Sequence, residues 1–370
     1  MRIGIDAHSL GSQQSGNETY YTSLLKSLAR LDAENDYFIY YTVEGATETL
    51  GLNNAHFSAR RLRPMNSYLR IPFAMPIEIL SQPVDVFHAQ FIIPPFLKCR
   101  TVTTIPDVAY EHHPEFFPYY QVAWSKKLIP WSARRADRII TVSEFSKADL
   151  VNLYRINPDK ITVTYEAAGS EFYPRDRERG REHVARRFGI DRPFVLYVGR
   201  LQARKNLVRL VEAYSRVRAQ GVEEQLVLVG KKDWLAQPVL DKIAELGLTR
   251  DVVVTGYVPA GDLPWFYNAA QVFAYPSIFE GFGLPVIEAM ASGLAVITSV
   301  GSSLQEVAGD AALIVDPLDV GAISQALGRM LSDRSLREEM GRAGIRRNKM
   351  FDRDRCAMDT LAVYRQAANA

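Results

Sequence analysis

The 370-residue sequence contains only two cysteines, Cys99 and Cys356, and they lie far apart in the chain. Neither belongs to a CxxC pair or to a His/Cys spacing typical of metal ligands, which argues against a disulfide scaffold and a structural zinc site. A reducing compartment is the natural setting for such a chain, so the sequence predicts a cytoplasmic protein.

Long apolar runs are also missing. No run of about 18 apolar residues occurs, and candidates such as 91–97 contain prolines, so we expect no membrane-spanning helix. The first apolar stretch is too short for the core of a signal peptide, so no export is expected. The sequence predicts a protein that is soluble or attached peripherally to the inner face of a membrane.

Neither sign of charge dominates: 44 Lys and Arg side chains face 42 Asp and Glu side chains, for a formal net charge of +2. This balance differs from the strongly basic one of a dedicated nucleic-acid binder, so no nucleic-acid partner is expected. The composition, 47% hydrophobic and 23% charged, is that of a globular protein. At roughly 100 to 200 residues per domain, the length predicts two domains, or three.

Short β-branched runs alternate with helical patterns along the chain, which predicts an α/β fold with parallel sheets covered by helices on both faces. In the first half the expected strands are 2–6, 36–42, 84–89, 101–105, 138–142 and 161–164. A highly charged stretch follows, and the alternation restarts at 194–198, 225–229, 252–255, 272–275, 295–298 and 312–315. Two Rossmann-like halves are therefore expected.

These patterns predict four segments: a first domain over 1–172, a charged linker over 173–192, a second domain over 193–350 and a C-terminal helical segment over 351–370. The helical pattern of Leu336–Ala367 is long enough for its end to return to the first domain.

In doubly wound sheets ligands bind at the carboxyl ends of the strands, so the loops that follow strands are the candidate sites. The loop after 194–198 carries Gly199, Arg200, Arg204 and Lys205 just before an amphipathic helix. Cations at a helix N-terminus are electrostatically unfavourable unless an anion lies between them. Phosphate binding is therefore the favoured interpretation, and a solvated charged loop is the alternative.

A second loop, after 272–275, contains Glu280, Gly281 and Gly283, and the helix that follows carries Pro285 in its first turn and Glu288 one turn later. Both carboxylates can face one pocket at the helix entrance, where they would accept hydrogen bonds from sugar or ribose hydroxyls. The alternative, equally supported by these residues, is that Glu280 caps the helix and Glu288 lies on a solvated face.

A third loop, 10–20, follows the first strand, and its glycines suit the approach of backbone amides to a diphosphate. It is not a G-x-G-x-x-G motif, so a flexible loop on the acceptor side fits equally well.

Taken together, these segments resemble the retaining glycosyltransferases of family 4. The resemblance covers nearly the whole chain and is carried by the Gly16 loop, Asp85–Gln90, Ala136–Lys147, the Val198-Gly-Arg200 loop with Lys205, and Glu280 to Glu288. It implies the GT-B fold, in which two Rossmann-like α/β/α domains face each other across a deep cleft. It also implies a nucleotide diphosphate sugar as donor substrate, with no cofactor and no metal.

The resemblance also implies roles for individual residues. Arg200 and Lys205 match the pair that holds the donor diphosphate, Glu280 matches the carboxylate near the transferred sugar, and Glu288 matches the one that binds the ribose hydroxyls. Backbone contacts to sugar and phosphate would come from Gly281, Phe282, Gly283 and Leu284, and Gly16 would approach the diphosphate from the first domain.

One position departs from the family pattern. Similar enzymes have His-Asp after the fourth strand, whereas this chain has Pro106 and Asp107. Proline has no side-chain donor, so the contact that the histidine makes to the transferred sugar is missing. Asp107 is retained as a candidate catalytic residue, and His112 and His113 either compensate or are merely solvated.

The sequence thus predicts a retaining hexosyltransferase of polysaccharide biosynthesis, with mannose from GDP-mannose as the leading donor and a glycan or lipid-linked hydroxyl as acceptor. The alternatives are a catalytically weak or silent nucleotide-sugar-binding protein of the same fold, a sugar-nucleotide epimerase, and a phosphorylase.

Two basic stretches allow two interpretations. They comprise Arg60, Arg61, Arg63 and Arg70 in one case and Lys126, Lys127, Arg134 and Arg135 in the other. Each is either a solvated face or a surface that touches an anionic membrane carrying the acceptor. His88, at the end of an expected strand, is interpreted as a packed or capping histidine.

Overall fold

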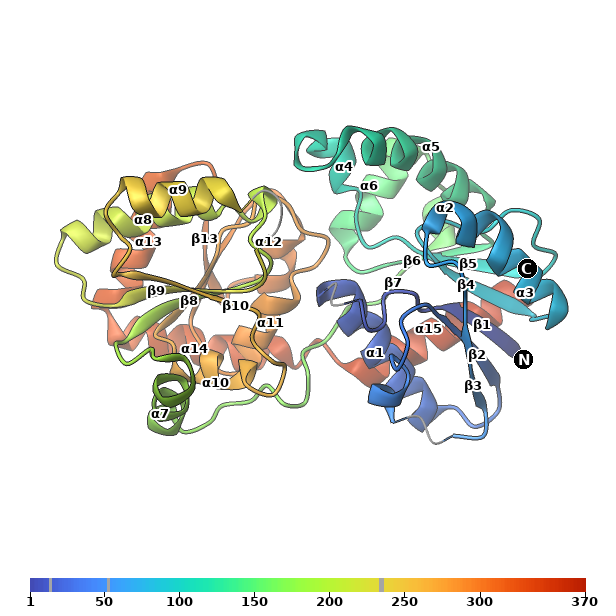
Figure 1. The fold of residues 1–370 in the computed structure, drawn as a ribbon, viewed down its shortest axis with the longest axis horizontal. Helices are drawn as coiled ribbons and strands as arrows, with labels where there is room; N and C mark the ends of the chain where they lie inside the picture. The colour runs from blue at the N-terminus through green and yellow to red at the C-terminus, as the bar shows by residue number, and fades with distance from the viewer. Residues whose placement is uncertain (13–14, 52–53, 233–235) are drawn as a thin grey trace. The chain divides into compact units, whose positions relative to one another are not determined.

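The computed structural model describes residues 1–12, 15–51, 54–232 and 236–370. The chain forms two units, the first made of residues 1–166 together with 352–370 and the second of residues 167–351. Each unit contains one sheet of parallel strands (Figure 1).

The first unit has a seven-stranded sheet in the order β3-β2-β1-β4-β5-β6-β7. Its strands are β1 (Arg2–Asp6), β2 (Asp36–Tyr41), β3 (Phe57–Arg61), β4 (Val86–Gln90), β5 (Arg100–Thr104), β6 (Arg138–Thr141) and β7 (Ile161–Val163). In the central strand, Ile3 lies opposite Tyr37 of β2 and Val86 of β4. All six strands expected in this half agree within two residues at each end, and β1 agrees in both bounds.

Helices cover both faces of this sheet. They are α1 (Ser15–Leu31), α2 (Ser67–Leu69), α3 (Met75–Ser81), α4 (Ala109–His112), α5 (Tyr119–Arg135), α6 (Glu144–Tyr154) and α15 (Arg353–Ala368). Helix α1 lies beside α15 on one face (Figure 1). On the other face, apolar side chains of α3, α5 and α6 form one core with the strands, as Met75, Ile129 and Leu150 illustrate.

Helix α15 belongs to the first unit because polar contacts as well as apolar ones hold it there. Tyr364 lies 2.7 Å from Nδ1 of the fully buried His88, whose Nε2 lies 2.6 Å from Oγ1 of Thr104. Burial lowers the pKa of His88 to about 3, so the ring is neutral at physiological pH. Asp354 accepts hydrogen bonds from Ser27 and Arg30 of α1. His88 is thus a packed histidine, as the sequence indicated.

The second unit has a six-stranded sheet in the order β10-β9-β8-β11-β12-β13. Its strands are β8 (Phe194–Val198), β9 (Gln225–Val229), β10 (Val252–Gly256), β11 (Val272–Tyr275), β12 (Val296–Ser299) and β13 (Ala312–Val315). The expected bounds of β8, β9, β11 and β13 are those observed. Continuous buried apolar runs mark these strands, since both faces of a parallel sheet are covered.

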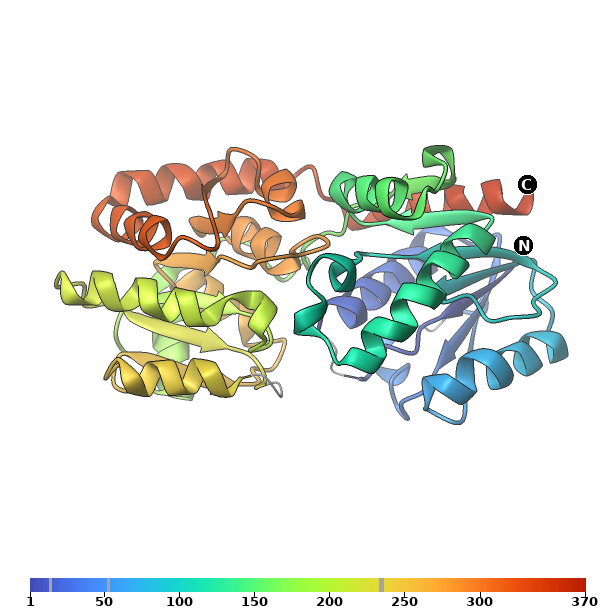
Figure 2. The ribbon, with the colours of Figure 1, turned by 90° about the horizontal axis from the view of Figure 1, so that it is seen from above.

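The helices of the second unit are α7 (Arg177–Phe188), α8 (Leu207–Ala219), α9 (Gln237–Glu245), α10 (Leu263–Ala269), α11 (Leu284–Ala291), α12 (Ser303–Ala308), α13 (Val320–Ser332) and α14 (Arg334–Asn348). Figures 1 and 2 show α8, α9 and α13 on one face of the sheet and α7, α10 and α14 on the other. No helix within the described residues has both the length and the apolar character needed to cross a bilayer.

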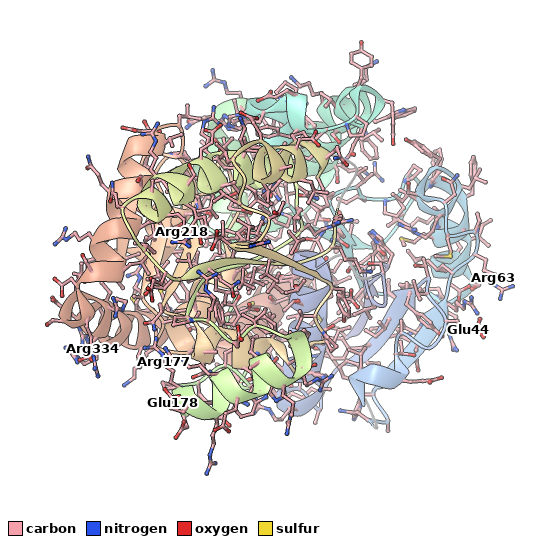
Figure 3. The ribbon with its side chains drawn as sticks, turned by 60° about the vertical axis from the view of Figure 1, so that its left-hand side comes forward. Glu44, Arg63, Arg177, Glu178, Arg218 and Arg334 are labelled. Carbon is pink, nitrogen blue, oxygen red and sulfur yellow. The ribbon has the colours of Figure 1, made fainter. Side chains whose placement is uncertain are left out.

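Three sequence expectations need correction. The expected linker 173–192 contains helix α7 of the second unit, and charged side chains such as Glu178 lie on its exposed side (Figure 3), whereas Arg177 donates a 2.6 Å hydrogen bond to the carbonyl of Ala270. Asp176 caps this helix at its start and Gly189 ends it, while the buried Val184 lies on its inner face. High overall charge concealed a helix with a narrow apolar stripe.

The helical pattern of Leu336–Ala367 forms two helices, α14 and α15, separated by residues 349–352, and α14 belongs to the second unit. The expected C-terminal segment 351–370 contains α15, which belongs to the first unit. The first unit boundary falls after Glu166 rather than after 172, and the second falls after Phe351, one residue from the expected 350. Strand β3 was not expected, because an edge strand with adjacent arginines lacks the apolar run by which the other strands were identified.

Candidate functional site

The candidate site lies at the carboxyl ends of β8 and β11, which are neighbours in the sheet of the second unit. The chain leaves β8 toward β9 on one side and returns to β11 on the other, so the strand order reverses between them. In open α/β sheets, such a reversal places two loops side by side and opens a binding crevice. The two loops are 199–206 and 276–283, which are two of the three candidate loops of the sequence analysis.

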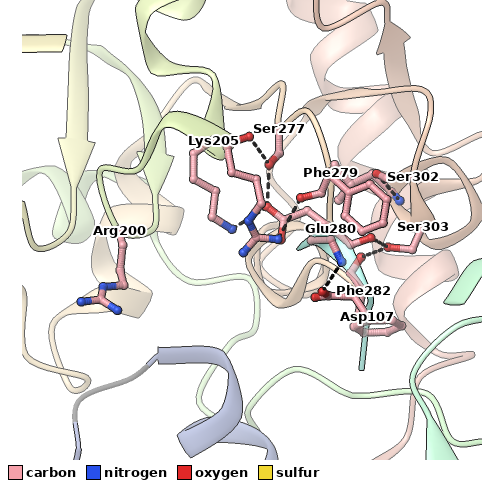
Figure 4. Close-up of polar contacts among 12 residues, drawn as sticks. Asp107, Arg200, Lys205, Ser277, Phe279, Glu280, Phe282, Ser302 and Ser303 are labelled. Atoms are coloured by element: carbon pink, nitrogen blue, oxygen red, sulfur yellow. Dashed lines mark hydrogen bonds and ion pairs between the residues drawn. The ribbon is translucent and has the colours of Figure 1, made fainter. Parts of the chain in front are cut away.

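Glu280 is the centre of this site (Figure 4). Its Oε1 accepts hydrogen bonds from Nζ of Lys205 at 2.5 Å and from Oγ of Ser277 at 2.6 Å. Its Oε2 lies 3.1 Å from Nη1 of Arg204, which also donates to the carbonyl of Phe279 at 2.9 Å. Two cations from the first loop therefore hold the carboxylate of the second.

Burial and charge together set the ionisation of this cluster. Glu280 and Lys205 are only 6% and 8% exposed. Burial alone would raise the pKa of Glu280, but the charges of Arg204 and Lys205 and the hydrogen bonds outweigh it and hold the pKa at about 2. Glu280 is therefore ionised at neutral pH, and the three charged groups together carry one net positive charge.

Lys205 also contacts Tyr275, the last residue of β11. Its Nζ donates to Oη of Tyr275 at 2.7 Å and lies 5.1 Å from the centre of that ring. Burial raises the pKa of Tyr275 well above its usual value, so the phenol stays protonated. The ammonium group is thereby fixed by a carboxylate, a hydroxyl and an aromatic face.

Glu288 is held separately from Glu280. It lies on α11, is 8% exposed, and accepts a 2.7 Å hydrogen bond on Oε2 from Tyr267 of α10. The alternative interpretation of the two glutamates is wrong: Glu288 is buried rather than solvated, and no side chain caps α11, whose N-cap is Gly283. Both carboxylates are therefore buried acceptors in the same loop and helix region.

The loop between the two glutamates is shaped by Gly283 and Ser303. Gly283 has a φ of 109°, a conformation that residues with a Cβ rarely adopt. Ser303 of α12 donates to the carbonyls of Glu280 at 2.8 Å and Phe282 at 3.1 Å. These contacts fix the backbone of 280–283 at the start of α11, where Leu284 is the first helical residue.

Gly283→Ala is expected to destabilise the protein by about 1 to 3 kcal/mol, because the new Cβ requires a strained φ and would lie 2.5 Å from Cδ2 of Leu304. Chemical denaturation followed by circular dichroism measures this loss. Gly261→Ala is the control, since its Cβ would meet no atom within 4 Å. Equal stability of the two variants would contradict the role given to Gly283.

Arg200 lies apart from the Glu280 cluster in Figure 4. Its carbonyl accepts a 3.0 Å hydrogen bond from Tyr197, so its backbone is tied to the end of β8. The structure brings Lys205 and Glu280 together, and Arg204 is the second cation on the carboxylate.

The first unit also carries candidate site residues. Gly16 lies in the first turn of α1 and is exposed, while Gln13 and Gln14 of the same expected phosphate loop lie outside the described residues. Asp107 accepts the backbone N–H of Ala109 at 3.0 Å and so anchors the start of α4. Beyond Pro106, His112 pairs with Asp149 at 2.9 Å and His113 with Glu115 at 3.1 Å.

Sequence reasoning gave no role to four residues that build the site: Tyr267, Tyr275, Ser277 and Ser303. Arg204 was seen as a cation of the first loop but not as a partner of Glu280. Its place directly before Lys205 was the available signal, whereas Tyr267 comes from a different helix and had none. Among the described residues, no group of three or more His, Cys, Asp or Glu side chains could hold a metal ion.

Comparison with known sequences places each unit in a family. The family model described as Glycosyl transferases group 1 matches residues 179–347, and the one described as Glycosyltransferase Family 4 matches residues 15–167. The first match contains the complete Lys205–Glu280 site, and the second covers most of the first unit.

Individual relatives agree with these matches. The chain is 36% identical over 284 residues to O-antigen chain mannosyltransferase B of Escherichia coli, covering 76% of this chain and 74% of that protein. It is 31% identical over 241 residues to MMP alpha-(1->4)-mannosyltransferase of Mycolicibacterium hassiacum, covering 64% of this chain and 55% of that protein.

Among solved structures, sucrose-phosphate synthase from Thermosynechococcus elongatus superposes with a TM-score of 0.83 over 99% of this chain and 98% of that one, at 22% identity. At this identity the likeness shows the fold alone, and the fold is GT-B. The expected family and fold are confirmed: the chain belongs to glycosyltransferase family 4 and is a glycosyltransferase of the GT-B fold.

Proposed function

We propose that this glycosyltransferase transfers a hexose from a nucleotide diphosphate sugar to a hydroxyl of a glycan or lipid-linked acceptor, with retention of anomeric configuration. The proposed hexose is mannose, and the proposed donor is GDP-mannose. The observation that carries the proposal is the buried Lys205–Glu280–Arg204 cluster at the reversal of strand order. The names of the two relatives, both mannosyltransferases, support mannose as the sugar.

The net positive charge of this cluster suits a departing diphosphate. As the bond between the anomeric carbon and the phosphate oxygen breaks, negative charge grows on the diphosphate, and fixed cations stabilise it without reorganisation. We assign this role to Lys205 and to Arg200. Lys205 is already immobilised by Glu280 and Tyr275, so it loses little conformational freedom when the donor binds.

Glu280 itself is an acceptor of hydrogen bonds in this proposal and not a proton donor. With a pKa of about 2 it carries no proton at neutral pH. We infer that it fixes Lys205 and accepts hydrogen bonds from hydroxyls of the transferred sugar, with backbone groups of Gly281, Phe282, Gly283 and Leu284 beside it.

Retention follows if the acceptor attacks the face of the sugar from which the diphosphate leaves. The acceptor oxygen forms the new bond to the anomeric carbon, the bond to the phosphate oxygen breaks, and the hydroxyl proton passes to that oxygen. Such a step needs neither a protein nucleophile nor a metal ion, since the protein's cations carry the charge. The roles of Gly16 and Asp107 stay predictions, as does the cytoplasmic location.

Glu288→Gln is expected to weaken the binding of GDP by about 10 to 100-fold, because a charged acceptor for the ribose hydroxyls is lost. Isothermal titration calorimetry measures the change in Kd. Tyr267→Phe is the matched control, because it removes the hydrogen bond to Oε2 but keeps the carboxylate, and should cost less. Unchanged GDP binding in Glu288→Gln would remove the ribose assignment.

The test of the function is nucleotide release from GDP-mannose, UDP-glucose and other sugar nucleotides, with and without mannose-terminated glycan acceptors and in the presence of EDTA. We expect acceptor-dependent release of GDP that the chelator does not reduce. The one-bond carbon–proton coupling at the anomeric carbon of the product should show retention.

Two other outcomes of this assay would contradict the proposal. Tight binding of nucleotide without turnover of any donor and acceptor pair would favour a silent binding protein, which the proline at 106 makes a specific alternative. Conversion of the sugar nucleotide without acceptor would favour an epimerase.

A further inference from the structure

One side of the first unit exposes several large apolar side chains. Helix α5 presents Tyr120, Trp124 and Trp131 to solvent, at 62%, 50% and 40% exposure. Lys127 and Arg135 lie on the same side of the helix. The five positions 120, 124, 127, 131 and 135 are three or four residues apart, so they form one stripe along the helix. The opposite side of α5 is buried through Ile129, Pro130, Ser132 and Ala133.

A second segment extends this stripe. Between residues 65 and 80 the exposed large side chains are Met65, Tyr68, Leu69, Phe73, Ile77 and Leu80. The ring of Tyr68 meets that of Trp124 edge-on, with centroids 5.8 Å apart, so the two segments form one surface. Figures 1 and 2 show α2, α3 and α5 on the same side of the first unit. We call these exposed residues of 65–80 and α5 the α2–α5 surface.

The exposed charge of helix α5 has one sign, and the acidic residue between 65 and 80, Glu78, is half-buried. Helix α5 carries Lys126, Lys127, Arg134 and Arg135 and no acidic residue. The guanidinium of Arg135 lies 5.7 Å from the ring centre of Trp131, so a cation and an aromatic side chain are adjacent on the surface. The acidic neighbour Glu111 is paired with Lys126 at 3.2 Å.

The other basic stretch contributes less than its sequence indicated. Arg70 is buried and donates to the carbonyl of Met65 at 2.7 Å, so it is not part of any surface. Arg61 pairs with Glu44 at 2.6 Å, and Arg60 donates to Gln82 at 3.3 Å. Arg63 is exposed at the edge of the unit (Figure 3).

We propose that the α2–α5 surface binds an anionic lipid bilayer peripherally. Aromatic side chains with a polar tip, such as Tyr120, Trp124 and Trp131, favour the headgroup level of a membrane. Leu69, Phe73 and Ile77 supply apolar groups that can enter the acyl boundary, and the basic side chains meet lipid phosphates. The basic side chains of α5, with no acidic residue on that helix, select an anionic lipid surface over a neutral one. This proposal concerns the first unit alone and does not depend on the donor or on turnover.

The test is sedimentation of the full chain with vesicles of phosphatidylcholine alone and of phosphatidylcholine mixed equally with phosphatidylglycerol. We expect at least about 10-fold stronger binding to the anionic vesicles. Trp124→Ala combined with Trp131→Ala should reduce that binding by about 10-fold or more. Lys127→Gln combined with Arg135→Gln should reduce it by about 5-fold per residue, since each basic group near the surface contributes independently.

Matched controls come from the second unit. Arg334→Gln with Arg342→Gln removes two basic groups of α14, and Leu318→Ala removes an apolar side chain that is 60% exposed. Both should leave vesicle binding unchanged, and the variant with Lys127→Gln and Arg135→Gln, which alters only exposed side chains, should unfold at the wild-type temperature.

Three results would overturn the proposal. These are no binding to either vesicle, equal binding to both, or equal loss in the controls. Self-association of the wild-type chain that the double tryptophan variant abolishes, without vesicle binding, would instead show that this surface joins two copies of the chain.

Discussion

Lys205→Met is expected to lower kcat/KM by at least about 100-fold, because it removes the best fixed cation near the departing diphosphate. Methionine keeps most of the length of the lysine side chain but no charge. The same variant leaves Glu280 buried with Arg204 and Ser277 as its remaining partners, so stability should fall by about 3 to 5 kcal/mol. Turnover measured well below the unfolding temperature gives the catalytic effect.

The double variant Lys205→Met with Glu280→Gln separates the two effects. Removing both charges should restore much of the stability lost in Lys205→Met, since no unpaired carboxylate stays buried. Activity should not return if Lys205 contacts the donor. Lys242→Met, which breaks a surface pair with Glu245, is the control and should change neither property. Recovery of turnover in the double variant would show that Lys205 acts only on Glu280.

Glu280→Gln should reduce both stability and turnover. The carboxylate holds two cations, and the pKa near 2, against an ordinary value of 4.5, corresponds to about 3 kcal/mol of stabilisation at neutral pH. Without it Lys205 loses its charged partner, and turnover should fall by about 100-fold. Urea denaturation and donor turnover of the two proteins provide the comparison.

The pH dependence of the free energy of unfolding tests whether the ionised carboxylate of Glu280 stabilises the protein. Because the folded pKa of Glu280 is lower than the unfolded one, its contribution is complete above about pH 4.5 and declines as the pH falls toward 2. The stability difference between wild type and Glu280→Gln should therefore be constant from pH 7 to about 5 and shrink below that range. A difference that persists unchanged at the lowest pH where both proteins fold would contradict this ionisation.

Much of the fold could be predicted because parallel strands buried on both faces are written as continuous apolar runs. The bounds of β8 and β11, which position the site, follow from this pattern alone. This pattern did not predict strand β3 or helix α7. Strand β3 is an edge strand with two arginines, and α7 buries only a narrow apolar stripe while most of its side chains are charged.

The site was predictable in its loops but not in its pairings. Lys205 and Glu280 lie 75 positions apart, and their loops meet because β8 and β11 are neighbours, which the resemblance to a known fold implied. That Tyr275 and Arg204 complete the cluster depends on side-chain directions at the ends of the strands. Tyr267 reaches Glu288 from another helix, and local patterns carry no information on such a contact.

A crystal structure of the protein with bound GDP would show whether the donor diphosphate binds at Lys205. The account predicts that a diphosphate oxygen lies at roughly 2.7 to 2.9 Å from Nζ of Lys205, with Arg200 turned toward the same group. It also predicts the ribose hydroxyls on Glu288. A diphosphate bound at a distance from the loops 199–206 and 276–283 would contradict the assignment of this cluster as the donor site.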